Sequence, residues 1–177
     1  MAEVCREVEK RAAQALKIAE GDRWLLDIAL DHLTLGRAAL YAAILENSAF
    51  HIPHSELEQA VDGLRRSGDQ DVLPHALLTR AWLRFLTGAR TGPESAQADL
   101  DEAWEIAERG PMRLFLADIH LYRARLFFRE EEYPWGSPAA DLAAAEKLIN
   151  DCGYHRRDEE LADAKRAILV TSETESL

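Results

Sequence analysis

Apolar residues recur along most of the chain at the spacing of one helix face. In segment 23–45 the apolar positions include Leu26, Ala29, Leu30 and Leu33, and segments 75–87 and 113–128 repeat the pattern. Steps of three and four residues place side chains on one side of an α-helix. No stretch keeps the alternation that a half-buried strand would need. The pattern therefore predicts an all-α fold.

Three sets of positions repeat at a nearly constant interval. The string L-x-R-A-x-L begins at residues 35, 78 and 121, so both of its intervals are 43. A leucine followed three residues later by alanine, and then a glycine, recur in step with it: Leu57 with Ala60, Leu100 with Ala103, Leu142 with Ala145, and Gly68, Gly110 and Gly153. Such periodicity is typical of helical repeat proteins. We predict three units of helix, loop, helix and glycine.

Capping signals set the expected boundaries. Ser55 with Glu58 resembles a capping box, Pro93 and Pro138 suit a first helical turn, and Ser137 suits an N-cap. The periodic glycines should follow helix ends at positive φ. The expected helices are 3–20, 23–45, 55–67, 72–88, 93–109, 112–131, 138–152 and 156–170. One domain, 1–177, would hold a first helix 3–20, repeats 22–68, 71–110 and 111–153, a capping helix 156–170, and a frayed tail 171–177.

Paired helices with these small residues resemble tetratricopeptide repeats. Ala38, Ala81 and Ala124 match the small residue that, in that family, lets the first helix pack closely on the second. The interval of 43 exceeds the family's usual 34, and an arginine precedes each of these alanines. The resemblance implies a right-handed α-solenoid of three such pairs with flanking single helices.

Four longer strings resemble the C-terminal helical-repeat region of large bacterial multidomain proteins. They are LLDIALDHLTLGRA (25–38), QAVDGLRRSG (59–68), DLDEAWEIAERGPMRL (99–114) and GYHRRDEEL (153–161). Those proteins often carry a STAND-type nucleotide switch, or a TIR-type or caspase-like effector, upstream. The resemblance implies a bacterial sensor or docking arm. No nucleotide-binding or effector motif occurs in this chain.

The arginines of the repeated string admit two interpretations. Arg37, Arg80 and Arg123 could form a row that binds an acidic peptide or a phosphate. Alternatively, each could pair with the acid of its own repeat, namely Arg37 with Glu56, Arg80 with Asp99, and Arg123 with Asp141. Because the acids share the period, we favour structural ion pairs.

The first helices of the pairs supply the expected binding surface. In the family that the chain resembles, these helices line the concave face, so the candidate partner-binding residues are His32, His75, Trp82, Phe85, Arg125 and Phe128. The alternative, which we favour for the three aromatic residues, is that they are ordinary core between the repeats. Equivalent histidines on neighbouring helices would lie about 10 Å apart, too far to share a metal ion. His51 with His54, and Cys152 with His155, are weak metal signals. Loop 133–136 is either a docking tip or, as we favour, a turn folded onto the helices.

Composition narrows the function further. Asp and Glu number 32 against 21 Lys and Arg, giving a net charge of -11 that opposes nucleic-acid binding. No uninterrupted apolar run approaches a membrane span, and the first residues lack the layout of a signal peptide. Two cysteines indicate no disulfide framework. We expect a cytoplasmic protein with no cofactor and no catalytic constellation.

The expected function is therefore non-catalytic binding of a peptide or protein partner on the concave face. The main alternative is an oligomerisation or autoregulatory arm of a larger protein, and small-molecule sensing or enzymatic activity is a weaker one. Segment 3–20 looks like the second helix of a repeat whose first helix is missing, so we expect self-association through it.

Overall fold

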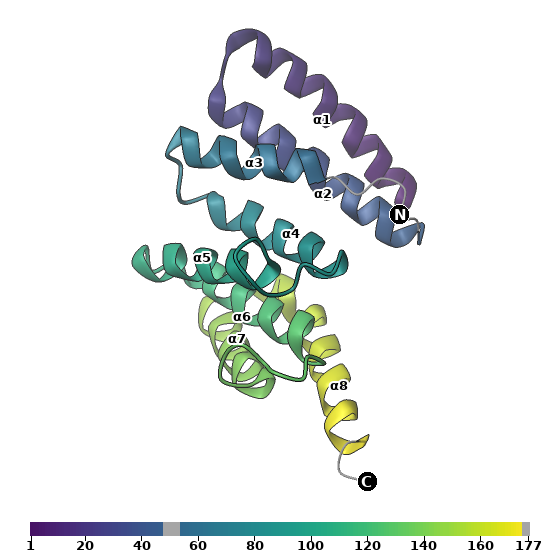
Figure 1. Ribbon diagram of the computed structural model, residues 1–177, viewed down its shortest axis with the longest axis vertical. Helices are drawn as coiled ribbons and strands as arrows, with labels where there is room; N and C mark the ends of the chain where they lie inside the picture. The colour runs from purple at the N-terminus through teal and green to yellow at the C-terminus, as the bar shows by residue number, and fades with distance from the viewer. Residues whose placement is uncertain (48–53, 175–177) are drawn as a thin grey trace. The chain divides into compact units, whose positions relative to one another are not determined.

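The chain folds into α-helices wherever its structure is described. The computed structural model describes the backbone of residues 1–47 and 54–174 and the side chains of those residues up to 168. The described part holds no strand, as the sequence predicted. Its elements are α1 Ala2–Asp22, α2 Leu25–Leu45, α3 His54–Ser67, α4 Leu73–Leu86, α5 Ala96–Arg109, α6 Arg113–Phe127, α7 Pro138–Cys152, the 3-10 turn η1 His155–Arg157, and α8 Asp158–Thr174 (Figure 1).

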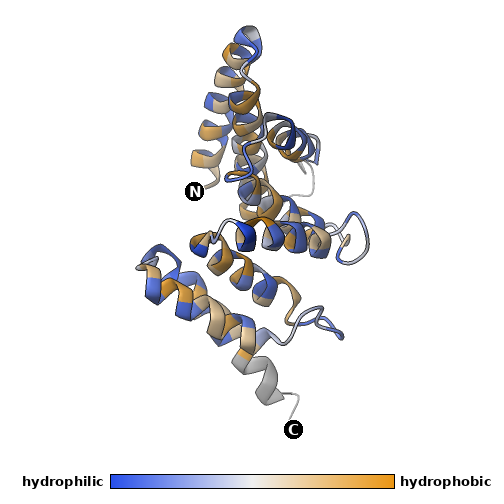
Figure 2. Cartoon of the chain, turned by 90° about the vertical axis from the view of Figure 1, so that its left-hand side faces the viewer, coloured by the Kyte–Doolittle hydropathy of each residue, from blue (hydrophilic) through white to orange (hydrophobic). Residues whose placement is uncertain are grey.

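The helices divide into two compact units, residues 1–99 and residues 100–177, with the boundary inside α5. In unit 1, α2 packs against α1 on one side and α3 on the other, and α3 packs on α4. Apolar and polar residues lie on different faces, so the helices in Figure 2 show orange and blue in turn. The single-domain expectation remains a prediction.

Helix α2 is the central helix of unit 1. Its 21 residues are long and apolar enough, by length and composition alone, to cross a membrane. The helix contains no uninterrupted apolar run of that length because Asp27, Asp31 and Arg37 are spread along it. Between α1 and α3 its small residues are buried, and Ala29 and Ala42 are fully enclosed. This burial is that of a core helix.

Two glycines set the close approach of α2 and α3. A Cβ on Gly36 of α2 would lie 2.5 Å from Leu57 Cδ2 of α3, and a Cβ on Gly63 of α3 would lie 2.7 Å from the Cβ of Ala29. Helix axes approach this closely only where side chains are small. The family resemblance predicts this role for Ala38, which is also buried, but Gly36 and Gly63 make the tightest contacts.

Unit 2 closes around α6, α7 and α8. Helix α6 packs along α7, and α8 contacts both. Its buried cluster consists of Ala117, Leu121, Ala124, Leu142, Ala145, Ile149, Leu161 and Ala164. The alanine of the repeated string and the leucine and alanine of the second helix, at positions 124, 142 and 145, all belong to this core. Their counterparts in unit 1, Ala81, Leu57 and Ala60, are equally buried.

Helix ends confirm some capping signals and correct others. The hydroxyl oxygen of Ser137 accepts a hydrogen bond from the Ala140 N–H at 3.1 Å, with Pro138 in the first turn, as predicted. Pro93 does not begin α5, because Ser95 caps it through the Ala98 N–H at 3.1 Å. Glu58 forms no capping box, since its carboxylate is bonded to Arg80 and Arg84 on α4.

The glycine expectation holds at two of its three positions. Gly68 and Gly153 adopt positive φ, 83° and 63°, just after α3 and α7. Gly110 does not, and α1 ends without a glycine, at Arg23 in the left-handed conformation with φ 59°. Residues 171–174 of the expected frayed tail belong instead to α8, and residues 175–177 lie outside the described residues.

Candidate functional site

Arg80 is the centre of a buried ion-pair network in unit 1. Its guanidinium donates to both carboxylate oxygens of Asp99, at 3.1 and 2.7 Å, and to Glu58 at 2.5 Å. Arg84, one turn later on α4, donates to the same two acids at 3.0 Å each. The side chains of Arg80 and Asp99 are only 5% and 2% exposed. The predicted Arg80–Asp99 pair is confirmed.

The network ties α4 to α3 and α5 rather than offering a free cation. Burial alone would lower the pKa of Arg80, but hydrogen bonds and charge from Asp99 and Glu58 outweigh it and raise the pKa. Two arginines and two acids leave no net charge. A buried, satisfied pair of this kind fixes register, and all three nitrogens of the Arg80 guanidinium already donate to acids.

Arg123 occupies the matching position in unit 2 but is held differently. Its guanidinium lies between two indole rings, 4.6 Å from the centroid of Trp104 and 4.5 Å from that of Trp135. It donates to Asp101 at 3.2 Å, and the Trp135 indole N–H donates to the same oxygen at 2.8 Å. Burial lowers the pKa of Arg123, and its Nε is a buried donor with no partner among the described residues.

The two arginines share one contact that the sequence analysis overlooked. Arg80 pairs with Glu58 and Arg123 with Asp101, and both separations are 22 residues. Glu58 and Asp101 are 43 residues apart, so this second row of acids follows the repeat interval and could have been found. The residue 22 positions before Arg37 is an alanine.

Arg37 accordingly forms no ion pair with any residue that the structure describes, so the predicted pair with Glu56 is wrong. Glu56 instead lies against Gly36, its Cβ being 3.5 Å from where a Cβ on that glycine would be. The arginine is half-buried on α2. A shared period in the sequence therefore did not guarantee a shared contact.

The predicted pair of Arg123 with Asp141 is also wrong, because other groups occupy that carboxylate. Nδ1 of His120 lies 2.6 Å from Asp141 Oδ1, and the Tyr133 hydroxyl donates to Oδ2. His120 packs edge-on against Trp104 at 5.0 Å between centroids. Burial and the hydrogen bond to Asp141 raise the pKa of Tyr133.

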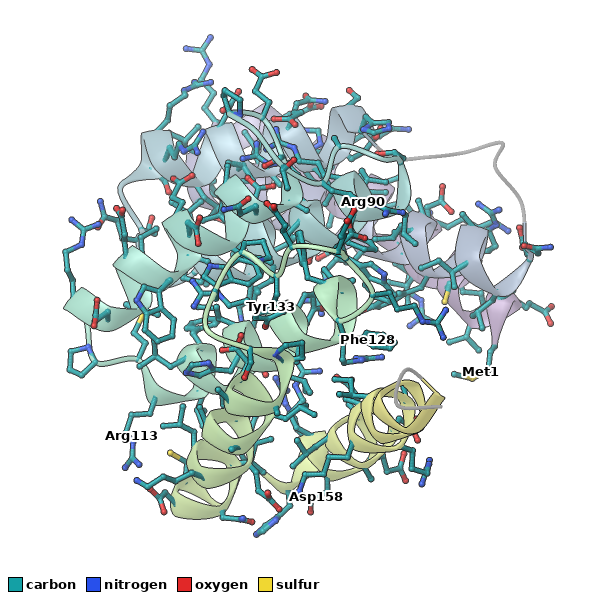
Figure 3. All side chains as sticks on the ribbon, turned by 60° about the horizontal axis from the view of Figure 1, so that its bottom comes forward. Met1, Arg90, Arg113, Phe128, Tyr133 and Asp158 are labelled. Atoms are coloured by element: carbon teal, nitrogen blue, oxygen red, sulfur yellow. The ribbon has the colours of Figure 1, made fainter. Side chains whose placement is uncertain are left out.

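Loop 133–136 is a turn folded onto the helices of unit 2, as favoured. Trp135 meets Phe127 edge-on with ring centroids 5.1 Å apart, and Tyr133 meets Trp135 at 5.5 Å. Tyr133 belongs to the loop that precedes α7 and lies on its inner side (Figure 3). The two aromatic rings of the loop complete the enclosure of Arg123 and are not presented as a docking tip.

The candidate binding residues of unit 1 are half-buried or buried. Trp82 packs against Tyr41 with ring centroids 5.6 Å apart, and the Arg90 guanidinium lies 4.7 Å above the Phe85 ring. His32 is 8% exposed, and its Nδ1 has no hydrogen-bond partner in the described part of the chain. His75 is half-buried on α4. None of these contacts by itself defines a ligand site.

The candidate residues of unit 2, Arg125 and Phe128, line a common groove between α6 and α8. The groove has a volume of about 170 Å³, and its remaining lining residues are Asp163, Ala164, Ala167 and Ile168. Phe128 lies at the end of α6 on the side of α8 (Figure 3). An apolar floor with a cation and an anion at its edge suits one apolar side chain beside a charged group.

Arg125 is held there by an exchangeable ion pair. It donates to Glu160 of α8 at 3.1 Å, and both side chains are more than a third exposed. Glu160 has a second partner, since the Arg157 guanidinium donates to it at 2.8 and 2.9 Å. An exposed pair is weak, and Glu160 would keep Arg157 if Arg125 turned to a ligand carboxylate.

Arg157 anchors the start of α8 from below this groove. Its Nε donates to the buried Asp118 of α6 at 2.7 Å, and the Tyr154 hydroxyl donates to the same carboxylate at 3.1 Å. Burial would lower the pKa of Arg157, but Asp118 and Glu160 raise it. Asp118 stands where the first two repeats have histidines, so that slot is structural in unit 2.

Metal chemistry has no support from the geometry of the described residues. Among them no group of three or more His, Cys, Asp and Glu side chains is arranged to hold an ion. His51, one member of the weak His51–His54 signal, lies outside the described residues, and His54 begins α3.

Comparison with known proteins identifies no family for this chain. No family model matches the chain, and neither a curated protein sequence nor a solved structure matches it.

Proposed function

We propose that this chain is a non-catalytic protein-interaction scaffold that binds a peptide segment of a partner in the α6–α8 groove. The observation that carries the proposal is the lining of that groove, where Phe128, Ala164 and Ile168 form an apolar floor beside the exchangeable cation of Arg125. The expected ligand presents an aliphatic or aromatic side chain next to a carboxylate.

The proposal includes the architecture that would display this groove. The chain is a right-handed solenoid of three tetratricopeptide-like helix pairs, in which first helices such as α4 and α6 face the partner. Its support is the recurrence of one contact, from an arginine of the first helix to an acid 22 residues earlier, in both units. Stacked repeats bury apolar area against their neighbours and form such surfaces without catalytic groups.

The distribution of arginines favours this groove over the arginine row as the ligand site. Arg80 and Arg123 are almost fully buried and committed to acids or indoles. Arg125 is 38% exposed, and among the described residues its hydrogen bond is to Glu160. A ligand carboxylate can reach it without breaking a buried pair.

The test begins with a random peptide library displayed against the intact chain. Selected peptides are synthesised, and their affinities are measured by calorimetry for the wild type, Phe128→Ala and Arg125→Glu. We expect an apolar residue beside an acid in the selected peptides, and at least about tenfold weaker binding to both variants, because truncating an anchor removes about 1.4 kcal/mol or more.

Arg113→Glu is the matched control, since Arg113 is an exposed arginine of the same unit paired with Asp151 at 3.0 Å. It should leave the affinity unchanged. Glu160→Gln should strengthen binding about two- to fivefold by releasing Arg125, the gain expected from a surface ion pair. The proposal is overturned if no peptide is selected, or if Arg113→Glu weakens binding as much as Arg125→Glu.

A further inference from the structure

Helix α1 carries a second apolar stripe that no described helix of unit 1 covers. Its side toward α2 buries Ala12 and Ala19, while Val4, Val8 and Ile18 are 58%, 38% and 65% exposed. With Met1 and the exposed Ala15 they follow steps of three and four residues, interrupted only by Arg11. From Met1 to Ile18 the stripe is about 26 Å long at about 1.5 Å per residue.

The charges beside the stripe form a pattern that is complementary to itself. Glu7 flanks its first half, and Arg11 stands within its second half. Within one chain Arg11 and Glu7 are 4.0 Å apart, and both are largely exposed, so this pair holds neither side chain firmly.

We infer that α1 pairs with α1 of a second copy of this chain, in antiparallel orientation. In the register where residue numbers of facing positions sum to 19, Met1 lies beside Ile18 of the second copy and Val4 beside its Ala15. Val8 then packs on the aliphatic stem of the second copy's Arg11. A two-fold axis makes each contact occur twice, as an isologous dimer requires.

The charge pattern selects this orientation. Antiparallel pairing places Glu7 of each copy beside Arg11 of the other, and the two-fold axis makes this contact occur twice. Parallel pairing would place Glu7 against Glu7 and Arg11 against Arg11, which is repulsive at both positions. Helix packing with steps of three and four residues supports the shallow crossing that such a pair needs.

The contact is small, so the dimer should be reversible. Five mostly small side chains from each copy bury less than the roughly 1,200–2,000 Å² of a stable interface. Sedimentation velocity of the full chain from micromolar to millimolar concentration should therefore show a monomer that shifts toward a dimer. This inference concerns residues outside the α6–α8 groove and does not rest on the proposed peptide binding.

Two substitutions of the same kind test whether the stripe, rather than any exposed apolar side chain, causes the dimerisation. Ile18→Glu places a charge within the stripe and should abolish the shift toward a dimer. Leu114→Glu makes the same change at a 46% exposed leucine of α6 and should leave the shift intact. Both positions are exposed, so far-UV circular dichroism should show unchanged helix content in each variant.

Charge reversal tests the pairing itself. Glu7→Arg alone and Arg11→Glu alone should each dimerise at least tenfold more weakly than the wild type. An equimolar mixture of the two should form a heterodimer, because arginines at 7 and 11 then face glutamates at 11 and 7.

A spin label at position 3, with both native cysteines replaced, tests the orientation. In the antiparallel register, position 3 of one copy faces position 16 of the other, so the two labels lie far apart along the helix pair. At a rise of about 1.5 Å per residue, their separation should be about 20 Å or more.

A chain that stays monomeric at millimolar concentration overturns the inference. It is also overturned if Leu114→Glu abolishes the dimer as Ile18→Glu does, or if the mixed variants fail to associate. An inter-label separation of about 10 Å, the distance between packed parallel helices, overturns the antiparallel arrangement.

Discussion

One repeated arginine has three different environments in this chain, and the neighbouring acids decide each of them. Arg80 has acids on both sides and is buried in a four-residue network. Arg123 has an acid on one side and two indoles around it. Arg37 has neither and stays half-buried without an ion pair in the described part of the chain. Each of these guanidinium groups is buried only where acids or aromatic rings surround it, since an unpartnered charge is costly to bury.

This difference predicts unequal effects of one substitution at two equivalent positions. Arg80→Met leaves Asp99 with Arg84 alone and Glu58 without its closest partner, so we expect a loss of about 3 kcal/mol in the free energy of unfolding. Arg37→Met, the same change at the matching repeat position, should cost less than about 1 kcal/mol. Urea unfolding followed by circular dichroism measures both, and equal losses would show that the network contributes nothing beyond side-chain packing.

Tyr133 gives a prediction in pH. Its raised pKa means that the folded chain keeps the phenol proton at alkaline pH, whereas the unfolded chain loses it above its ordinary value of 10.0. The contribution of the Tyr133 hydroxyl to stability is therefore complete below pH 10 and falls above it, by about 1.4 kcal/mol per pH unit.

Tyr133→Phe keeps the ring and removes both the hydrogen bond to Asp141 and the titration. We expect it to cost about 1.5–3 kcal/mol at pH 8, as for a hydrogen bond to a charged group. The gap between wild type and variant should narrow at pH 10–11. Urea unfolding at several pH values measures this gap, and a gap that is constant over that range would contradict a buried, hydrogen-bonded phenol.

From the sequence, an individual ion pair could be predicted correctly only where both partners belong to the same repeat. Arg80 with Asp99 followed from a common interval, but Arg123 with Asp101 joins neighbouring repeats, which a search within each repeat does not compare. Asp141 is hydrogen-bonded to His120 and Tyr133 rather than to Arg123, because of the way loop 133–136 folds back onto the helices. The path of this loop is set by the packing of the Tyr133 and Trp135 rings, which leaves no periodic pattern in the sequence.

At the scale of elements, the contact between α2 and α3 depends on glycines without side chains. Gly63→Ala would bring two Cβ atoms to 2.7 Å, and Ala29 has no flexible side chain that could move away. The helices must separate, at a cost of about 1–3 kcal/mol, against less than about 1 kcal/mol gained from the better helix propensity of alanine.

Gly21→Ala in α1 is the control, because nothing lies within 4 Å of a Cβ there. It should stabilise the chain by up to about 1 kcal/mol, so the two glycine substitutions should have opposite signs. Thermal unfolding measures both melting temperatures. A Gly63→Ala variant as stable as the wild type would mean that α2 and α3 can separate freely.

The helices themselves were the most predictable feature, and their exact boundaries were less so. The periodic apolar face fixes where a helix must pack, so the predicted ranges lie within a few residues of α1 to α7. Pro93 indicated too early a start for α5, because Ser95 is the better cap and accepts a hydrogen bond from the N–H of Ala98, three residues later. Glu58 was predicted to cap α3, because a glutamate at this position could serve either as a capping side chain or as an ion-pair partner. Only the position of the neighbouring helix α4 decides between the two.

At the scale of the whole molecule, two surfaces with different chemistry belong to different units. The stripe of α1 is aliphatic and self-complementary in charge, whereas the α6–α8 groove has an apolar floor and an exchangeable arginine. The net charge of -11 is consistent with both, since an acidic surface overall leaves recognition to such local features. Composition alone could not locate either surface, because both consist of ordinary residues whose exposure depends on the fold.

Because the two surfaces share no residue, we predict that self-association and peptide binding are independent. The two sets of residues belong to different units, and no side chain belongs to both sets. Binding energies couple only when one event changes groups that the other needs. A peptide selected for the groove should therefore bind the monomeric Ile18→Glu variant and the wild type with affinities within about twofold, and saturating peptide should leave the sedimentation of the wild type unchanged. Calorimetry and sedimentation of the same samples measure both directions of this linkage. If the affinity and the dimerisation constant changed together by the same factor, binding in unit 2 would be altering unit 1, and the chain would transmit a signal rather than serve as a passive scaffold.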